Sequence, residues 1–426
     1  MTKKERKTNF EIVSKKMNRV VVTGIGAVSP IGNSFSESWV NARSGLSGIQ
    51  PTTRFDVSGS KWKVAGELKE FDAEKFLSPR EITRLDPFVH YAVSAALMAA
   101  EDARIIHHPS LSSGGVIIGS GRGGISTLER ELQKKYSSRP SPYASRTSAY
   151  LMPSTTISMA SSYVAQKLGI RGYCLSISNA CASGTNAIGE AYRLIRTGYK
   201  NLILCGGTEA PICRICSEGY GASGALSAGK DSSASRPFDR TRDGFVLSEG
   251  ACILVLEDYE SALKRSAKIY GEVIGYGNTT DAFHQIKPSP EGEAEAIKVA
   301  MDEAGLRAGD ISFINAHGTS TPLGDKTETE AIKLFFGRYA YKVPVTSVKS
   351  MTGHMLAASG PLEAALTLMS MKEGILPPTI NLKERDPECD LDYVTESRKA
   401  EIKFAISQSF GFGGVNAVLV FKRPDV

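Results

Sequence analysis

The chain of 426 residues lacks several features that would place it in other classes of protein. No apolar run reaches the roughly 18 to 20 residues that a membrane-spanning helix needs. The N-terminus, MTKKERKTNFEIVSKKM, has neither an apolar core nor a small-residue cleavage site, so a secretory signal is not expected. The cysteines number only seven, and an odd count without a signal favours free thiols in a reducing compartment. We therefore expect a cytoplasmic protein without a membrane partner.

An excess of one charge sign is also nearly absent after the first 16 residues. The net charge is +6, but residues 1–16 hold six bases and two acids and so supply most of that excess. The rest of the chain is nearly balanced, which argues against nucleic acid as a partner. Residues 1–18 are predicted to form a basic, disordered extension, and ordered sequence is predicted from Arg19.

Apolar runs that end in glycine alternate with helical patterns along the rest of the chain. Strands that alternate with helices predict parallel or mixed sheets with both faces covered. Helices are predicted at 88–104 and 181–198, and strands at 19–23, 115–119, 173–180, 201–207 and 252–258. GIGAVSPIG is expected to end the first strand.

Two segments share one order of features. Residues 173–198 and 343–374 each run from a strand through a corner of small residues into a helix that ends at glycine. This repetition predicts a duplicated fold of two similar halves. The division is placed near residue 265, which gives an N-terminal half at 19–264 and a C-terminal half at 265–426.

Cys181 lies at a strand-to-helix corner in SISNACASG. Small neighbours let a substrate and the backbone approach closely. The free N–H groups and the dipole of a helix start favour a nucleophilic thiolate, and a backbone N–H there can also bind an oxyanion. A cysteine taken alone is more often a buried structural residue. Two histidine loops elsewhere in the chain favour the catalytic reading.

The histidines in question are two of only six in the chain. His317 follows an apolar strand in FINAHGTSTPLGD, and Thr319 and Thr321 beside it can hydrogen-bond a polar substrate arm. His354 and Lys349 share a loop before a helix in TSVKSMTGHMLAASGP. Loops after strand ends in α/β sheets are where ligands usually bind. One cysteine with two such histidines suits thioester chemistry, since a neutral imidazole can stabilise an enolate.

Two further groups each allow two interpretations. Glu363 begins the helix after His354, where it either complements the helix dipole from solvent or orders Lys349 from a buried position. The loop QSFGFGG before the last strand is either a plain hairpin turn or a flexible element that brings Phe412 and an N–H group to the site.

Two motifs are expected to carry no chemistry. GSGRGG fits a dinucleotide fingerprint after a strand, but no acid follows about 20 residues later. A single CxxC at Cys213 and Cys216 lacks the second pair that zinc needs, so a packed pair of free thiols is expected rather than a metal or redox site.

Six motifs stand in a fixed order between about Arg19 and Lys422: RVVVTGIGAVSPIG, ACASG, RPFDRTRDGFVLSEGA, NAHGTSTPLGD, SVKSMTGHMLAASG and SFGFGG. Together they resemble the elongating β-ketoacyl-[acyl-carrier-protein] synthases, closest to the synthase II type. The resemblance implies the α/β thiolase fold, a duplicated αβαβα core with two mixed five-stranded sheets, in a homodimer. It also implies a decarboxylative Claisen condensation of malonyl-carrier with an acyl-Cys181 thioester, which lengthens the acyl chain by two carbons without a metal or other cofactor.

The resemblance further implies a role for individual residues. Those at the reacting centre are Cys181 as acylated nucleophile, His317 and His354 as the pair for decarboxylation and condensation, Lys349 as the residue that tunes them, Glu363 as its companion, and Phe412 as a gate whose N–H joins that of Cys181 in an oxyanion hole. Those around it are Thr319 and Thr321 on the phosphopantetheine arm, Phe410 against the substrate, and Arg80 and Arg84 as a docking site for the acidic acyl carrier protein.

One residue departs from the family pattern. Arg122 in GSGRGGIS stands where synthase II has an apolar residue in the acyl pocket. A charge beside an acyl tail is costly unless it is paired or turned away. Arg122 therefore either shortens the pocket or reaches an acid across the dimer, and the preferred chain length stays open.

Three other functions are compatible with parts of this pattern. A polyketide ketosynthase uses the same residues on another carrier. A non-catalytic chain-length factor would lack the nucleophile, which this chain has. A thiolase would need a second cysteine where this chain has SFGFGG.

Overall fold

The computed structural model describes residues 17–136 and 147–425. The basic extension predicted at residues 1–18 falls outside this part except for its last two residues. Among the described residues, no helix combines the length and apolar character needed to cross a bilayer.

Ten strands form one sheet that has two five-stranded halves. The strands of the first half, in spatial order, are β5 (Tyr173–Ile177), β4 (Gly115–Gly119), β6 (Leu202–Glu209), β7 (Gly250–Asp258) and β1 (Val20–Val28). The strands of the second half, from its outer edge inward, are β10 (Val345–Thr346), β9 (Phe313–Asn315), β13 (Phe404–Gly411), β14 (Val415–Lys422) and β8 (Gly271–Thr280).

The two halves repeat the same pattern of strand directions. In each half the three outer strands are parallel, and the two inner strands run antiparallel to their neighbours. Strands β5 and β10 hold equivalent places, and they belong to the two segments whose sequence order is repeated. The predicted duplication is thus confirmed. The two predicted five-stranded sheets are joined at their inner edges, where β1 pairs with β8 over three residue pairs.

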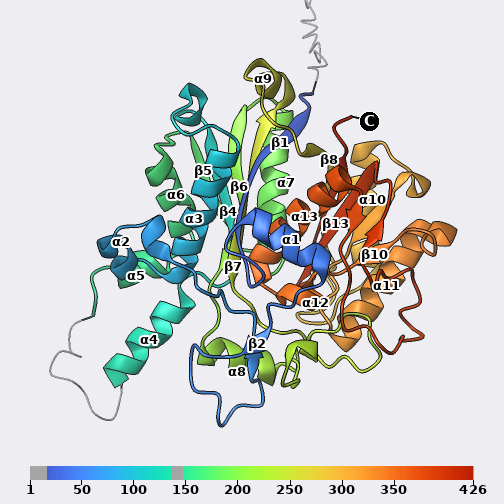
Figure 1. Ribbon diagram of the computed structural model, residues 1–426, viewed down its shortest axis with the longest axis horizontal. Helices are drawn as coiled ribbons and strands as arrows, with labels where there is room; N and C mark the ends of the chain where they lie inside the picture. The colour runs from blue at the N-terminus through green and yellow to red at the C-terminus, as the bar shows by residue number, and fades with distance from the viewer. Residues whose placement is uncertain (1–16, 137–146, 426) are drawn as a thin grey trace, which may run out of the picture.

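Helices cover both faces of each half and a shared layer lies between the halves (Figure 1). The central helices α7 and α13 contact strands of both halves, α3 and α6 cover the outer face of the first half, and α10 with α11 covers that of the second. This arrangement is the expected αβαβα layering. The bounds of these helices are α3 (Pro87–Asp102), α6 (Met159–Leu168), α7 (Ser183–Arg196), α10 (Pro290–Ala304), α11 (Pro322–Phe336) and α13 (Ser359–Glu373).

Shorter elements complete the described part of the chain. The remaining helices are α1 (Phe35–Ser44), α2 (Pro79–Arg84), α4 (Ile125–Tyr136), α5 (Leu151–Thr155), α8 (Arg214–Ala222), α9 (Tyr259–Lys264) and α12 (Lys349–Thr352). Two small antiparallel pairs join β2 (Gln50–Pro51) to β3 (Val64–Ala65) and β11 (Ile375–Leu376) to β12 (Arg398–Lys399).

Strand β1 is longer than the sequence predicted. The glycines were expected to end it after residue 23, but it continues to Val28 with a shift of register between Val22 and Gly24. Glycine is needed here for contact rather than for a turn, because a Cβ at Gly24 or Gly26 would overlap the backbone of α3. The glycines therefore let α3 pack directly on the strand.

We expect Gly26→Ala to lower the free energy of unfolding by about 1 to 3 kcal/mol, because its Cβ would overlap the carbonyl oxygen of Ala95 on α3. Gly59→Ala is the matched control, since no heavy atom lies within 4 Å of a Cβ there. Urea denaturation of the two variants measures the difference. Equal midpoints for both variants would show that α3 does not hold its position against the strand.

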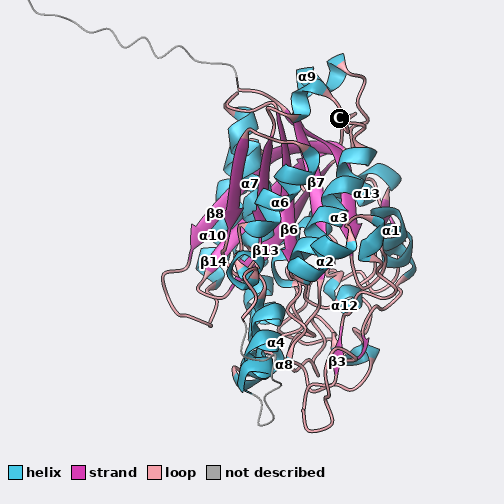
Figure 2. Cartoon of the chain, turned by 90° about the vertical axis from the view of Figure 1, so that its left-hand side faces the viewer, coloured by secondary structure: helices cyan, strands magenta, loops and turns pink. Residues whose placement is uncertain are grey.

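The C-terminal ends of strands from both halves of the sheet lie close together and place the candidate site, since Gly411 at the end of β13 lies against Cys181 after β5. Strands β9, β10 and β13 are parallel neighbours, so their C-terminal ends meet at one edge of the second half. Strand β5 brings the equivalent end of the first half to the corner before α7. Figure 2 shows loops and short helices gathered at one end of the strands, α8 and α12 among them. Ligand sites of α/β sheets are usually found at such ends.

Candidate active site

Cys181 lies in the tight corner between β5 and α7. Ala180 before it adopts a left-handed conformation with φ of 47°, which turns the chain sharply into the helix. The hydroxyl of Ser183 holds this corner, since it accepts from the N–H of Asn179 at 2.8 Å and donates to the carbonyl of Ala180 at 2.6 Å. The side chain of Cys181 is half-buried, so its sulfur is presented at the helix start as the sequence predicted.

His354 is in hydrogen-bond contact with this sulfur. Its Nε2 lies 3.0 Å from Cys181 Sγ, and its Nδ1 lies 3.2 Å from Ser359 Oγ. The same Ser359 oxygen accepts from the N–H of Met355 at 2.9 Å and has a second lone pair for Nδ1–H. With the proton on Nδ1, the free Nε2 accepts the S–H of Cys181. His354 is therefore placed to take the proton when the sulfur attacks.

The electrostatics at Cys181 differ from the prediction based on the helix start alone. Burial raises the pKa of the Cys181 thiol to about 11, while the positive charges of Lys349 and Arg122 and an N–H from Phe412 act in the opposite direction. Because the loss of water outweighs these contributions, the resting group is a thiol. The nucleophile is thus made by proton transfer to His354 rather than by a standing thiolate.

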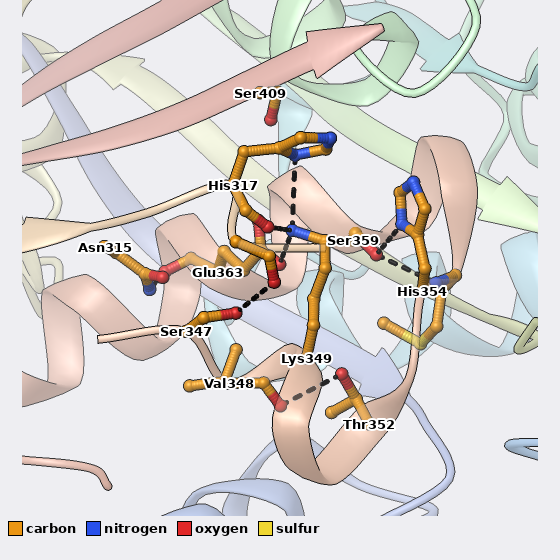
Figure 3. Close-up of polar contacts among 12 residues, drawn as sticks. Asn315, His317, Ser347, Val348, Lys349, Thr352, His354, Ser359, Glu363 and Ser409 are labelled. Atoms are coloured by element: carbon orange, nitrogen blue, oxygen red, sulfur yellow. Dashed lines mark hydrogen bonds and ion pairs between the residues drawn. The ribbon is translucent and has the colours of Figure 1, made fainter. Parts of the chain in front are cut away.

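Lys349 and Glu363 form a buried pair beside His317, and Lys349 contacts both of the other residues (Figure 3). Lys349 is 1% exposed, and its ammonium donates to Glu363 Oε1 at 2.5 Å and to the carbonyl of His317 at 2.6 Å. It also lies 3.3 Å from His317 Nδ1. Since an ammonium has only donors, Nδ1 accepts and the proton of His317 is on Nε2. The pair therefore fixes the tautomer that His317 presents to the cavity. Glu363 takes the buried one of its two predicted positions.

Both histidines are held neutral. Burial lowers the pKa of His317 and His354 well below the usual value, and the charge of Lys349 lowers both further. Their rings meet edge to face with centroids 5.3 Å apart. Burial also raises the pKa of Glu363, against the pull of the Lys349 charge. The site thus presents two uncharged imidazoles above one buried ion pair.

A carboxylate fixes the His317 loop from behind. Glu328 on α11 accepts from the N–H of His317 at 2.6 Å and from that of Gly318 at 2.7 Å. Burial raises its pKa to about 8, although both N–H donors favour its charged form. Glu328 was not predicted from the sequence. Its position three residues after Asp325, inside a helix that follows the histidine loop, was an available signal.

A cavity of about 340 Å³ opens onto the sulfur and both imidazoles. Thr319 and Thr321 line it with hydroxyls 2.9 Å apart, and Phe410 and Phe412 line it from the β13–β14 hairpin. Gly411 between the phenylalanines lies so close that a Cβ there would be 3.2 Å from Cys181 N. The structure thus brings together the predicted residues Cys181, His317, His354, Thr319, Thr321, Phe410 and Phe412, with Lys349 and Glu363 directly below.

The same side chains have the donor set of a metal site. Ligand atoms of Cys181, His317 and His354 lie within 4.8 Å of one another, the sole group of this kind among the residues the structure describes. Thiolate and imidazole are ligands that Zn²⁺ prefers. The observed contact between Sγ and Nε2 is equally that of a nucleophile and its base.

Three predicted residues lie apart from the cavity. Arg80 and Arg84 are on α2 at the outside of the first half, and Arg84 lies over the ring of Tyr150 with 4.3 Å between guanidinium carbon and centroid. Arg122 is exposed and does not line the cavity, in contrast to the predicted position in the acyl pocket. Its Nε donates to Tyr220 Oη at 2.8 Å, so the guanidinium is directed at the side chain of Tyr220.

Two aromatic residues of the cavity were not predicted. Tyr220 on α8 and Phe245 line it, with ring centroids 5.5 Å apart. The Phe245 ring also lies edge to face against His354, with centroids 5.2 Å apart. No local pattern marks either residue, because both reach the site only through the fold of distant segments.

Comparison with known proteins agrees with this geometry. The model of the N-terminal domain of beta-ketoacyl synthases matches residues 17–262, and that of the C-terminal domain matches residues 270–383. The chain belongs to the beta-ketoacyl synthase family. This beta-ketoacyl synthase is 47% identical to 3-oxoacyl-[acyl-carrier-protein] synthase 2 of Synechocystis, over 95% of its own chain and 98% of that protein. It is 46% identical to the protein of the same name from Staphylococcus aureus, over 95% and 98%.

Solved structures share the fold of this beta-ketoacyl synthase. The ishigamide ketosynthase/chain length factor matches with a TM-score of 0.90 and 34% identity, covering 96% of this chain and 99% of that one. A type II PKS ketosynthase, solved with its acyl-carrier protein and a bound hexaketide, matches with a TM-score of 0.87 and 33% identity, covering 96% and 100%. The thiolase-like fold is confirmed by these matches.

Proposed function

We propose that this protein is a 3-oxoacyl-[acyl-carrier-protein] synthase that elongates fatty acyl chains by decarboxylative condensation. The proposal rests on the contact of 3.0 Å between Cys181 Sγ and His354 Nε2, made in a cavity that His317 also lines. The names of the relatives at 46–47% identity support the fatty-acid reaction.

In the first half-reaction an acyl group moves from the carrier thioester to Cys181. The sulfur attacks the thioester carbon while His354 Nε2 takes its proton, and the carrier thiolate leaves and recovers a proton. The carbonyl oxygen becomes negatively charged in the tetrahedral intermediate. The backbone N–H groups of Cys181 and Phe412 donate hydrogen bonds to this oxyanion. Two donors at such an oxyanion are worth several powers of ten in rate.

In the second half-reaction malonyl-carrier loses carbon dioxide at the two histidines. The electrons of the broken bond form an enolate, whose oxygen accepts from the Nε2–H of His317. The enolate carbon then attacks the acyl-Cys181 carbon, and the cysteine sulfur leaves as a thiolate that takes up a proton from solvent to regenerate the thiol. The product is a 3-oxoacyl-carrier two carbons longer. No redox cofactor takes part in this scheme, because no electron enters or leaves overall.

The acyl carrier protein is the proposed partner. Thr319 and Thr321 hold the amide groups of its phosphopantetheine arm through their paired hydroxyls at the cavity. Arg80, which is exposed on α2, and Arg84 beside it are proposed to meet the acidic carrier surface. A structural relative at 33% identity was solved with its acyl-carrier protein, which supports this class of partner.

A homodimer is proposed from the outer edge of the first half. Strand β5 has a neighbour on one side only in the described part of the chain, and its residues Cys174 and Leu175 are exposed. Such an edge pairs readily with another strand. The same strand of a second copy would continue the sheet and cover these side chains. The seven cysteines are all free thiols, which supports a reducing compartment and so the cytoplasm.

The alternative of a polyketide ketosynthase is favoured by the structural relatives, which include a type II PKS ketosynthase at 33% identity. The higher identity of the fatty-acid relatives favours the first proposal. A chain-length-factor-like partner without activity is disfavoured, because the complete arrangement of Cys181, His317 and His354 is present.

Purified protein supplied with acyl-carrier and malonyl-carrier tests the proposed reaction. We expect mass spectrometry of the carrier arm to show a 3-oxoacyl group two carbons longer than the starting acyl group. Repeated extension without reduction would identify the polyketide reaction instead. Absence of both products with every acyl-carrier offered would contradict the proposed function.

A further inference from the structure

Three aromatic rings form a wall on one side of the cavity. Tyr220 forms this wall between two rings, with centroids 5.5 Å from Phe245 and 6.3 Å from Phe412. Arg122 lies beyond the wall, since it binds the Tyr220 hydroxyl and does not line the cavity. An acyl group on Cys181 that extends toward this wall meets the ring of Tyr220.

The hydroxyl of Tyr220 has an unusual set of partners. Its oxygen accepts from Arg122 Nε at 2.8 Å, and the guanidinium carbon lies 5.1 Å from the ring centroid. Within residues 17–136 and 147–425, the hydroxyl proton has no acceptor, and neither of the two terminal nitrogens of Arg122 has one. Among the described residues, the Tyr220 hydroxyl thus keeps its proton available for an acceptor, and the neighbouring positive charge makes this hydroxyl a stronger donor.

Arg122 is held in place by a buried acid. Glu209 at the end of β6 is 0% exposed, and its Oε1 accepts from the backbone N–H groups of Gly121 and Arg122 and from the hydroxyl of Ser120. Burial raises the pKa of Glu209 to about 8, against the effect of these donors and of the Arg122 charge. The backbone of the loop after β4 is thereby fixed, and the hydrogen bond from Arg122 Nε to the Tyr220 hydroxyl orients the guanidinium.

We propose that the Arg122–Tyr220 pair is a specificity device that selects acyl groups bearing an oxygen acceptor at their distal end over plain alkyl chains of the same length. Tyr220 is the residue that contacts the substrate, and Arg122 is a positioning residue that orients and polarises its hydroxyl. The proposal rests on the proposed function and names its acyl substrate more closely. Either a carboxylate or a ketone at the chain end supplies the required acceptor.

The physical reason is the cost of an unmade hydrogen bond. An alkyl end pressed against Tyr220 removes water from its hydroxyl, which then has no acceptor, and this loss lowers affinity about tenfold or more. An oxygen at the same position accepts the Tyr220 proton instead. Sites built with buried donors discriminate strongly for this reason, whereas apolar pockets discriminate weakly between chain ends.

The test compares four acyl-carriers of equal chain length: plain alkyl, ω-hydroxyacyl, ω-carboxyacyl and one with a ketone near the chain end. We expect kcat/KM of the full-length wild type to be about tenfold higher for the carboxylate or ketone substrate than for the alkyl one. Tyr220→Phe keeps the ring and removes only the donor, so it should erase this ratio. Arg122→Ile should reduce the ratio and raise turnover of the alkyl substrate, because the hydroxyl is no longer polarised or held.

The outcomes separate the two proposals. If wild type condenses none of the acyl-carriers with malonyl-carrier, the proposed function fails. If it condenses them with equal kcat/KM, or with a preference that Tyr220→Phe leaves intact, the proposed function stands and the specificity device is wrong. Loss of the dimer on Arg122→Ile, with an unchanged substrate ratio, would assign Arg122 to an interface between copies and would also overturn the device.

Discussion

Cys181→Ala is expected to abolish elongation, with a fall of at least about 10⁴-fold in turnover, as for the loss of other catalytic nucleophiles. The substitution removes the sulfur that forms the covalent bond and leaves no other thiol among the described residues that line the cavity. The helix corner keeps its hydrogen bonds, because Ser183 makes them with backbone atoms. Mass spectrometry of the protein after exposure to acyl-carrier should find acylated wild type and unmodified variant.

Cys216→Ala is the matched control for this experiment. Cys216 belongs to the same apolar cluster that packs against Cys181, but it is buried at 8% exposure and does not line the cavity. The control should acylate and elongate like wild type, apart from a small loss of stability. Elongation by Cys181→Ala at the wild-type rate would remove Cys181 from the mechanism. Thermal denaturation checks whether Cys181→Ala is folded, and we expect it to unfold cooperatively like wild type.

The sequence carried enough information to predict the layered fold and the composition of the reacting centre. The reason is that each catalytic group follows a strand end, and strand ends are marked locally by apolar runs that stop at small residues. The repetition of strand, corner and helix at 173–198 and 343–374 reflects equivalent places of β5 and β10 in the two halves. A local pattern could therefore report a global symmetry.

Features that depend on contacts between distant segments could not be predicted. Gly24 and Gly26 look like strand breakers in sequence, but they are required by the approach of α3. Tyr220 and Phe245 carry no local signal, and they meet His354 and Phe412 only after α8 folds across the cavity. The direction of the Arg122 side chain likewise depends on its tyrosine partner.

Electrostatic predictions from one element were incomplete for the same reason. The helix start at Cys181 favours a thiolate by itself, but burial of the sulfur has the larger effect and favours the thiol. As a consequence, the two histidines have different roles. His354 contacts the sulfur and moves its proton, whereas the tautomer of His317 is fixed by Lys349 for hydrogen-bond donation.

His317→Ala is expected to lower carbon dioxide release from malonyl-carrier by about 10²- to 10³-fold, the usual effect of removing one donor from a developing oxyanion. Acylation of Cys181 should continue, because His354 remains in contact with the sulfur. Release of labelled carbon dioxide and mass spectrometry of the acyl-enzyme measure the two steps separately. His107→Ala, a change at a histidine outside the cavity, is the control.

The pH dependence distinguishes a hydrogen-bond donor from a titrating acid. Burial and the Lys349 charge lower the pKa of His317 well below 6.5, so the imidazole stays neutral as the pH falls from 8 to 6. Decarboxylation by wild type should therefore show no inflection near pH 6.5, where an ordinary histidine would be half protonated. A rate that changes through pH 6.5 in wild type, and no longer does so in His317→Ala, would show that His317 titrates. In that case the buried Lys349–Glu363 pair would not hold it neutral. A flat profile together with intact acylation in the variant would assign His317 to the enolate alone.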